Sequence, residues 1–195
     1  DNYPTQPYSA SPGEFRFMDL DGDGRVTADD DRTIIGNRFP KYTFGGQVNA
    51  QFRNLDLSLQ FTGQAGADRL IVNGYMNRAL NRSSNVQRWM YENRWSPDNP
   101  DPNAKYPRMI VHSDGRYAWP STYWMRSASF LRLSNIQLGY SLPVDLVDSI
   151  GIRNLYFYMN ARNLMTFSDY YDGWDPETNW YPPTRLLSVG INITF

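Results

Sequence analysis

The 195-residue sequence contains no cysteine and almost no net charge, and each shortage excludes a class of protein. Without cysteine there is no disulfide scaffold, no thiolate zinc site and no cysteine nucleophile. A net charge of −1 at pH 7 provides no strong field that would attract nucleic acid or anionic lipid. The chemistry of this chain therefore depends on oxygen-bearing, amide and aromatic side chains.

The residues that enzymes use are also scarce. His112 is the only histidine, and no serine or cysteine nucleophile pattern lies near it. There is no glycine-rich phosphate loop. Asp172, Asp175 and Glu177 could form a glycosidase pair, but in a loop rich in Pro and Trp they are more simply solvated or loop-ordering residues. We therefore do not expect an enzyme.

Long apolar runs are lacking too. No run approaches the roughly 20 residues that a membrane-spanning helix needs. This shortage does not exclude a membrane β-barrel, because the strands of a barrel show only alternation over about ten residues. The composition favours a barrel: aromatic residues make up 15% of the chain, with 14 Tyr and 6 Trp, while the mean hydropathy is only −0.62. Tyr and Trp concentrate where a barrel wall meets the membrane surfaces.

Alternation of apolar and polar residues predicts about six strands. The segment 185–195 is the cleanest, with an apolar residue at every second position and an aromatic end at Phe195, as in the last strand of bacterial outer-membrane barrels. In the segment 127–142 the alternation changes phase, which predicts a β-bulge near residues 134–135. The predicted strands are residues 14–18, 42–52, 55–62, 127–142, 152–167 and 185–195.

Short and long connections alternate between these strands. Residues 53–54 and 143–151 are short connections, whereas 19–41, 63–126 and 168–184 are long. Outer-membrane barrels have short periplasmic turns and long extracellular loops. The pattern therefore favours a barrel wall over a soluble antiparallel sheet with one face in a core. Six strands cannot enclose a lumen, so we expect an incomplete barrel that further strands continue.

Residues 19–30 match the template of a calcium-binding loop, in which hard cations take oxygen ligands. Gly24 permits the sharp turn of the template, and an aspartate stands where an EF-hand has a glutamate. The predicted ligands are Asp19, Asp21, Asp23, the carbonyl of Arg25, Thr27 and Asp30. The ion would be structural and would fix an extracellular loop. The alternatives are a solvated acidic turn, since Asp and Gly form turns without any ion, or a site for magnesium or sodium.

Tryptophans in the long loops are weak candidates for substrate binding, because an exposed ring can stack on a sugar face. The alternative is that these rings belong to the interfacial girdle or pack the loop cores. That alternative is stronger for Trp119 and Trp124, which adjoin a strand. The candidates for substrate binding are Trp89, Trp95, Trp174 and Trp180.

Three stretches of the chain carry a family resemblance. They read GEFRFMDLDGDG followed by DRTIIGN at residues 13–37, YAWPSTYWMRSASFLRLSNIQLGY at 117–140, and ARNLMTF followed by YDGWDPE at 161–177. In this order they resemble the C-terminal region of the SusC/RagA family of TonB-dependent outer-membrane transporters. With the final strand, the resemblance spans nearly the whole chain.

The resemblance implies an all-β, antiparallel transmembrane barrel of about 22 strands with a plugged lumen. Residues 1–195 would be the C-terminal part, and the plug, the TonB box and the N-terminal strands would lie outside them. It implies active import of a glycan, oligosaccharide or peptide across the outer membrane of a Gram-negative, Bacteroidetes-like bacterium. A SusD-like surface lipoprotein and the TonB complex are the implied partners. The competing interpretations are a soluble, calcium-stabilised, carbohydrate-binding β-sandwich and a passive porin.

Overall fold

The computed structural model describes residues 3–71, 80, 85–110, 116–170, 174–177, 181 and 183–195. The chain divides into two compact units. One comprises Asp1–Ile35 and Leu70–Met125, and the other comprises Gly36–Arg69 and Arg126–Phe195. Among the described residues, no helix has both the length and the apolar character needed to cross a membrane.

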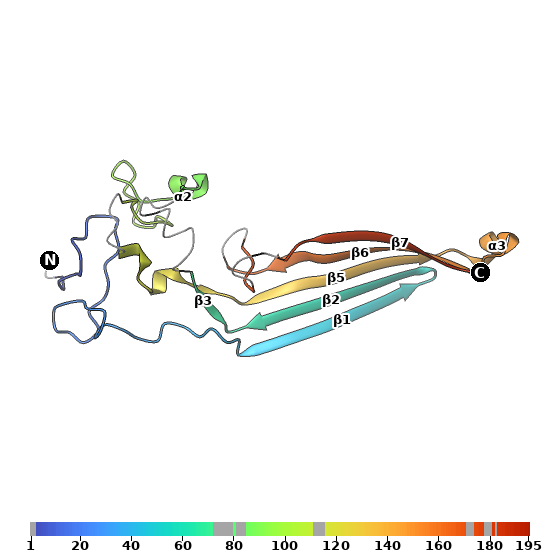
Figure 1. Ribbon diagram of the computed structural model, residues 1–195, viewed down its shortest axis with the longest axis horizontal. Coiled ribbons are helices and arrows are strands. Elements are labelled where there is room, and N and C mark those ends of the chain that lie inside the picture. Colours follow the sequence, from blue (N-terminus) through green and yellow to red (C-terminus); the bar gives the residue numbers. More distant parts are fainter. Residues whose placement is uncertain are drawn as a thin grey trace. The chain divides into compact units, whose positions relative to one another are not determined.

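The second unit is a five-stranded antiparallel sheet in the order β1-β2-β5-β6-β7 (Figure 1). Its strands are β1 (Tyr42–Phe52), β2 (Leu55–Ala65), β5 (Phe130–Ser141), β6 (Asn154–Phe167) and β7 (Leu186–Thr194). They confirm five of the six predicted strands and the all-β, antiparallel class. Their lengths run from 9 to 14 residues, and a strand that crosses the hydrocarbon core of a membrane needs about 9–11.

The four connections between the five strands of this sheet alternate in length as predicted, whereas residues 19–41 do not join two strands, because no strand forms at 14–18. A two-residue turn joins β1 to β2, and its first residue, Arg53, has φ 55°. The short connection from β5 to β6 contains α3 (Val144–Val147) and η3 (Asp148–Ile150). Because neighbouring strands are antiparallel, both short connections lie at one end of the sheet. The long connections, residues 66–129 and 168–185, leave from the other end.

The registers of all four strand pairs place apolar residues on one face and polar residues on the other. One row across the sheet reads Ala50, Leu57, Leu138, Met159 and Val189. The adjacent row, on the opposite face, reads Asn49, Ser58, Gln137, Asn160 and Ser188. We call these the apolar face and the polar face.

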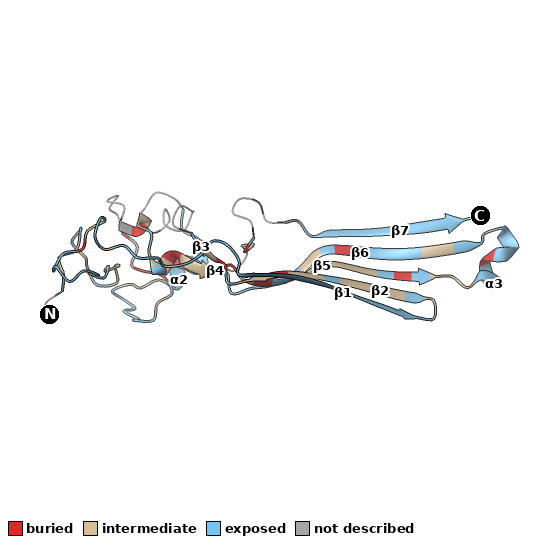
Figure 2. Ribbon diagram, turned by 90° about the horizontal axis from the view of Figure 1, so that it is seen from below, coloured by how far each residue is buried: buried red, intermediate tan, exposed pale blue. Residues whose placement is uncertain are grey.

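The apolar face is exposed rather than buried. Val189 is 81% exposed, Val48 54% and Met159 51%. Figure 2 shows that β1 and β7 are exposed along nearly their whole lengths. The described part of the chain therefore does not enclose these side chains as a soluble core would.

The predicted β-bulge is confirmed at Ser134, which the register leaves between two pairs of the β2–β5 ladder. The Ser134 hydroxyl donates to the carbonyl of Gln60 at 3.0 Å. The extra residue keeps Leu133 and Ile136 on the apolar face although three positions separate them. On the facing strand β6, Asn163 has φ 51°, a left-handed conformation that asparagine tolerates.

Two tyrosine rings of β6 cover glycines of the neighbouring strands on the polar face. The Tyr156 ring lies over Gly139 of β5, and the Tyr158 ring lies over Gly190 of β7. The two rings stack with their centroids 5.9 Å apart. The Tyr156 hydroxyl donates to a carboxylate oxygen of Asp56 at 2.9 Å, which ties β6 to β2 across β5. Glycine is needed under each ring, since a ring that lies flat on the sheet leaves no room for a Cβ.

The first unit has little regular structure and is held by aromatic packing. Its helical segments are α2 (Arg88–Glu92), η1 (Arg116–Ala118) and η2 (Thr122–Trp124). The side chains of Tyr117 and Trp124 are fully buried. Phe15 is the hub, with its ring centroid 4.5–6.3 Å from those of Tyr117, Tyr123 and Trp124.

The predicted strand at residues 14–18 is wrong. The backbone of Phe17 bonds to a side chain instead of a neighbouring strand: its N–H donates to Gln6 Oε1 at 2.8 Å, and its carbonyl accepts from Gln6 Nε2 at 3.0 Å. The alternation of Phe15 and Phe17 reflects aromatic packing, because Phe17 stacks on Trp119 at 5.2 Å. The short strands β3 (Asp68–Leu70) and β4 (Met125–Ser127), which pair in a separate sheet, were too short to be predicted.

We predict that Gly139→Val destabilises the sheet in the full-length protein. A Cβ at this position would lie 2.0 Å from the Tyr156 hydroxyl, so the ring must leave its place and lose the bond to Asp56. We expect a cost of about 1–3 kcal/mol, measured by thermal unfolding in detergent. The double variant Gly139→Val with Tyr156→Ala should recover much of this loss. Equal melting temperatures for Gly139→Val and the parent would contradict the packing described.

Candidate functional site

The acidic loop predicted as a metal site folds around its own carboxylates. The two carboxylate oxygens of Asp19 accept hydrogen bonds from the amides of Gly22 at 2.7 Å and Gly24 at 2.9 Å. The Gly24 and Gly22 amides together hold the pKa of Asp19 below its usual range. Both glycines have φ near +80°, a conformation that side chains of other residues disfavour. The sequence thus builds a tight turn that fixes an ionised carboxylate.

Three carboxylates converge in this loop. Asp19, Asp21 and Asp31 each offer one oxygen within 4.8 Å of the others. Asp31 is held in place because its oxygens accept from the amides of Leu20 at 2.5 Å and Thr27 at 2.7 Å. The Asp23 amide lowers the pKa of Asp21, but desolvation and the negative charges of Asp23 and Asp31 outweigh it, so the pKa is raised overall. A cation would relieve this repulsion.

The structure places the other predicted ligands differently. Asp23 lies outside the group of three carboxylates, and its side chain accepts from the Arg25 amide at 2.7 Å. Asp30 also lies outside it, because its carboxylate accepts from the Thr27 hydroxyl at 3.1 Å. That hydroxyl accepts in turn from the Asp30 amide. The template counted to Asp30, whereas the folded loop brings in the next residue, Asp31. Because Asp29, Asp30 and Asp31 follow one another in the sequence, either Asp30 or Asp31 could have been the last carboxylate of the metal loop.

The acidic loop is anchored to the N-terminal segment. The Thr5 amide donates to the Gly24 carbonyl at 2.9 Å, and the Val26 amide donates to the Thr5 carbonyl at 2.8 Å. Val26 is buried, with 5% of its surface exposed. Anything that orders the loop therefore also orders residues near the start of the chain.

The predicted substrate tryptophans differ in what they can offer. Trp89 is 37% exposed, with its ring centroid 5.5 Å from that of Tyr106. The Trp95 ring lies against Gly13, where a Cβ would come within 2.2 Å of the ring. Trp174 is partly buried in the connection from β6 to β7. Trp180, like His112 and Asp172, lies outside the described residues. Trp119 and Trp124 pack against Phe17 and Phe15, in line with the loop-core alternative.

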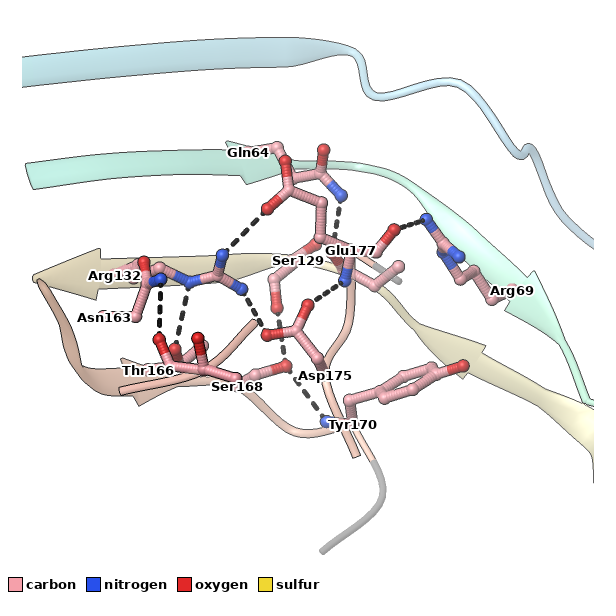
Figure 3. A network of polar contacts seen from close by, with 12 residues as sticks. Gln64, Arg69, Ser129, Arg132, Asn163, Thr166, Ser168, Tyr170, Asp175 and Glu177 are labelled. Atoms are coloured by element: carbon pink, nitrogen blue, oxygen red, sulfur yellow. Dashed lines mark hydrogen bonds and ion pairs between the residues drawn. The ribbon is translucent and has the colours of Figure 1, made fainter. Parts of the chain in front are cut away.

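A buried charge network on the polar face was missed at the level of sequence. Arg132 of β5 is 5% exposed. Its guanidinium binds Asp175 at 2.5 Å and Glu177 at 2.9 Å, both from the connection between β6 and β7 (Figure 3). Its Nε donates to the Thr166 hydroxyl at 3.1 Å, and its Cζ lies 4.8 Å from the ring centroid of Phe130.

Sequence reasoning could have found only part of this network. The period-two pattern puts Arg132 on the polar face, between two leucines. Its partners are 43 and 45 residues further along the chain, in a loop without a periodic pattern. Asp175 and Glu177 order the loop, as one of the two sequence interpretations held, and Asp175 is buried rather than solvated.

The comparisons with known proteins agree on one group. No family model matches the chain. A TonB-dependent receptor, P3, from Formosa agariphila is 30% identical over 95% of this chain, which corresponds to 19% of that receptor. The TonB-dependent receptor SusC from Bacteroides thetaiotaomicron is 25% identical over 96% of this chain and 18% of its own length.

The solved structures give the same answer for the fold. The RagAB peptide importer in its closed-closed state superposes with a TM-score of 0.70 at 28% identity, over 91% of this chain and 20% of that chain. Its open-open state gives a TM-score of 0.66 at 27% identity. The chain thus spans about one fifth of the length of the proteins that it matches.

Proposed function

The chain is homologous over nearly its whole length to one part of the TonB-dependent receptors of the SusC and RagA type, and we propose that it forms part of the wall of an outer-membrane β-barrel that imports a nutrient. The observation that carries the proposal is the apolar face, which extends over all five strands and is exposed. The homology to TonB-dependent receptors favours import that depends on TonB.

The energetics of the apolar face favour lipid as its neighbour. Fully burying a Val, Leu, Ile or Met side chain is worth about 1.5–3 kcal/mol, so a face of such residues left in water is costly. Soluble monomers rarely expose contiguous apolar patches of this kind. In a barrel the same residues meet lipid tails, and the polar face meets an aqueous lumen. The amide row Asn49, Gln137 and Asn160 suits that second environment.

The free edges of the sheet support a larger barrel. β1 and β7 are the outermost strands and pair on one side only within the described residues. In hydrocarbon, a strand edge without partners leaves backbone N–H and C=O groups unsatisfied, which costs several kcal/mol for each group. We therefore propose that further strands of the same protein continue the sheet beyond both edges. In this proposal the chain is the C-terminal part of the barrel, and a plug with a TonB box precedes it.

The competing interpretations fit less well. A β-sandwich would bury the apolar face against a second sheet about 10 Å away, whereas Val189 and Leu187 are 81% and 70% exposed. A passive porin would share the same wall, and only the homology to TonB-dependent receptors favours active import over it.

The first test compares two adjacent residues of β7 in the full-length protein. Val189→Arg places a charge on the apolar face, and Ser188→Arg places it on the polar face. Near the middle of a membrane the first change should cost about 2–4 kcal/mol and the second much less. Urea unfolding in lipid vesicles measures both. Because Val189 is 81% exposed, a water-facing sheet would tolerate both changes equally, and that result would remove the proposal.

The second test concerns the two edges. We expect the outward-pointing amides of β1 and β7 to exchange with deuterium as slowly as those of β5 in the full-length protein, because further strands would pair with them. Hydrogen exchange with mass spectrometry measures this, with the amides of α3 as the fast internal reference. Rapid exchange along either edge would show that it meets water.

The relatives support a proposal for the substrate and the partners as well. The similar solved structure RagAB is a peptide importer, and the relative SusC is a TonB-dependent receptor. We infer a glycan, oligosaccharide or peptide as the substrate and a SusD-like lipoprotein and TonB as partners, with no catalytic step. Trp89 and Trp174 stay candidates for contact with substrate, whereas Trp95 is packed against Gly13.

A structural calcium ion in the acidic loop is a further part of the proposal. The donor set fits, because Asp19, Asp21 and Asp31 supply the oxygen ligands that calcium prefers, within 4.8 Å of one another. The ion would stabilise the turn and, through the bonds of Thr5, the start of the chain. It would have no role in transport chemistry.

The calcium proposal predicts a difference between two neighbouring aspartates. In the full-length protein, calcium should protect the loop from proteolysis compared with a chelator. Asp31→Asn should weaken this protection about tenfold or more in calcium concentration, and Asp30→Asn much less, because only Asp31 belongs to the converging group. The same cleavage with calcium and with chelator in the parent protein would mean that no ion is bound.

A further inference from the structure

We propose that Arg132 is a positioning residue whose charge holds residues 174–177 on the polar face of the sheet, where they restrict the access of substrate to that face. We call residues 174–177 the strap, and Arg132 with Asp175 and Glu177 the latch. The placement of the strap follows from this structure alone. The restriction of access rests on the proposed function, in which the polar face lines the path of the substrate.

The latch joins the strap to the middle strand of the sheet. Figure 3 shows the Arg132 side chain reaching from β5 to both carboxylates of the strap. Arg132 lies opposite Thr62 of β2 and Thr166 of β6, which places it on the polar face. Its Nε donates to the Thr166 hydroxyl, so a residue of β6 helps to orient the guanidinium. All three nitrogens of the guanidinium are therefore used, two of them on the strap.

One more contact fastens the strap, and another fastens Ser168, at the start of the same connection. Arg69 Nη2 donates to the Glu177 carbonyl at 2.5 Å, and the Ser168 hydroxyl donates to the Ser129 carbonyl at 2.9 Å (Figure 3). Within the strap, the Glu177 amide donates to Asp175 at 2.9 Å and keeps the two carboxylates turned toward Arg132. Pro176, between them, is fully buried. The strap is thus seated on the sheet, and the connection from β6 to β7 is not free in solvent at this point.

The burial of the latch indicates positioning rather than stabilisation. The side chains of Arg132 and Asp175 are only 6% and 8% exposed, while that of Glu177 is 53% exposed. The desolvation of a buried ion pair offsets most of its attraction, so such a pair adds little net stability. Removing one partner leaves an uncompensated buried charge, which strongly disfavours the arrangement. The pair therefore selects one position of the strap, and the strap can leave only by separating the charges.

The experiment uses the full-length protein in outer-membrane vesicles, with any cysteines elsewhere replaced. The natural chain has no cysteine, so Pro176→Cys introduces a unique thiol within it. A membrane-impermeant maleimide should label this thiol slowly while the strap is seated. Arg132→Met should raise the labelling rate at least about tenfold, because the buried carboxylate of Asp175 loses the opposite charge of the guanidinium. The matched control is Arg162→Met, which removes the same charge from an exposed position on the same face.

A second measurement keeps Pro176 intact. A spin label at Tyr181→Cys, where the native side chain is 86% exposed, should become more mobile with Arg132→Met and stay unchanged with Arg162→Met. The double variant Arg132→Met with Asp175→Met removes both buried charges and should return the label toward the mobility of the parent. Equal mobility in the parent, Arg132→Met and Arg162→Met would overturn the latch.

Uptake is measured separately in cells that carry the same variants. If the latch is confirmed and Arg132→Met changes the uptake or its dependence on substrate size while Arg162→Met does not, the strap restricts access as proposed. If the latch is confirmed and uptake is unchanged, the restriction is refuted and the placement of the strap still holds. Neither labelling measurement needs a substrate, so a failure of the proposed transport function would be seen independently of the latch.

Discussion

The separation of an apolar and a polar face across five strands is the constraint on which the rest of the structure depends. Side chains alternate with a period of two, so a slip of one residue in any strand pair would move a whole row to the wrong face. The registers of all four pairs avoid this, and the single change of phase, in β5, is absorbed by the bulge at Ser134. The bulge thus exists to keep Leu131 and Leu133 on the same side as Ile136.

An apolar core, which stabilises most soluble domains, does not stabilise this sheet. The large apolar side chains of the sheet unit point outward, so they cannot supply a protein core. Backbone ladders and polar side chains hold the sheet instead, as the bond from Tyr156 to Asp56 across three strands shows. Arg132 and the buried carboxylate of Asp175 also meet on the polar face. Charge–charge contacts there do the positioning that apolar packing does in a soluble domain.

Whether an element could be predicted from the sequence depends on how far apart along the chain its interacting residues lie. β1, β2, β5, β6, β7 and the bulge could be predicted, because alternation is local and each strand repeats it over nine residues or more. Residues 14–18 also alternate, but they do not form a strand. The Gln6 side chain bonds to the backbone of Phe17, and the Phe17 ring packs on Trp119, about 100 residues further along the chain. The converging position of Asp31 depends on the path of one turn, which a template with fixed spacing cannot follow. The partners of Arg132 lie too far along the chain for any local pattern.

Charged side chains order two of the loop segments, residues 19–31 and residues 174–177. A segment of four residues such as 174–177 cannot form a core of its own, so specific contacts must offset the conformational entropy that it loses on ordering. Carboxylates with defined partners provide a specific alternative: amides hold Asp19 and Asp31, and a guanidinium holds Asp175. Such contacts are directional, so they select one conformation of the loop. They add little net stability, so the loop can still leave that conformation. A loop built in this way can hold one position and still be released when its charges are separated.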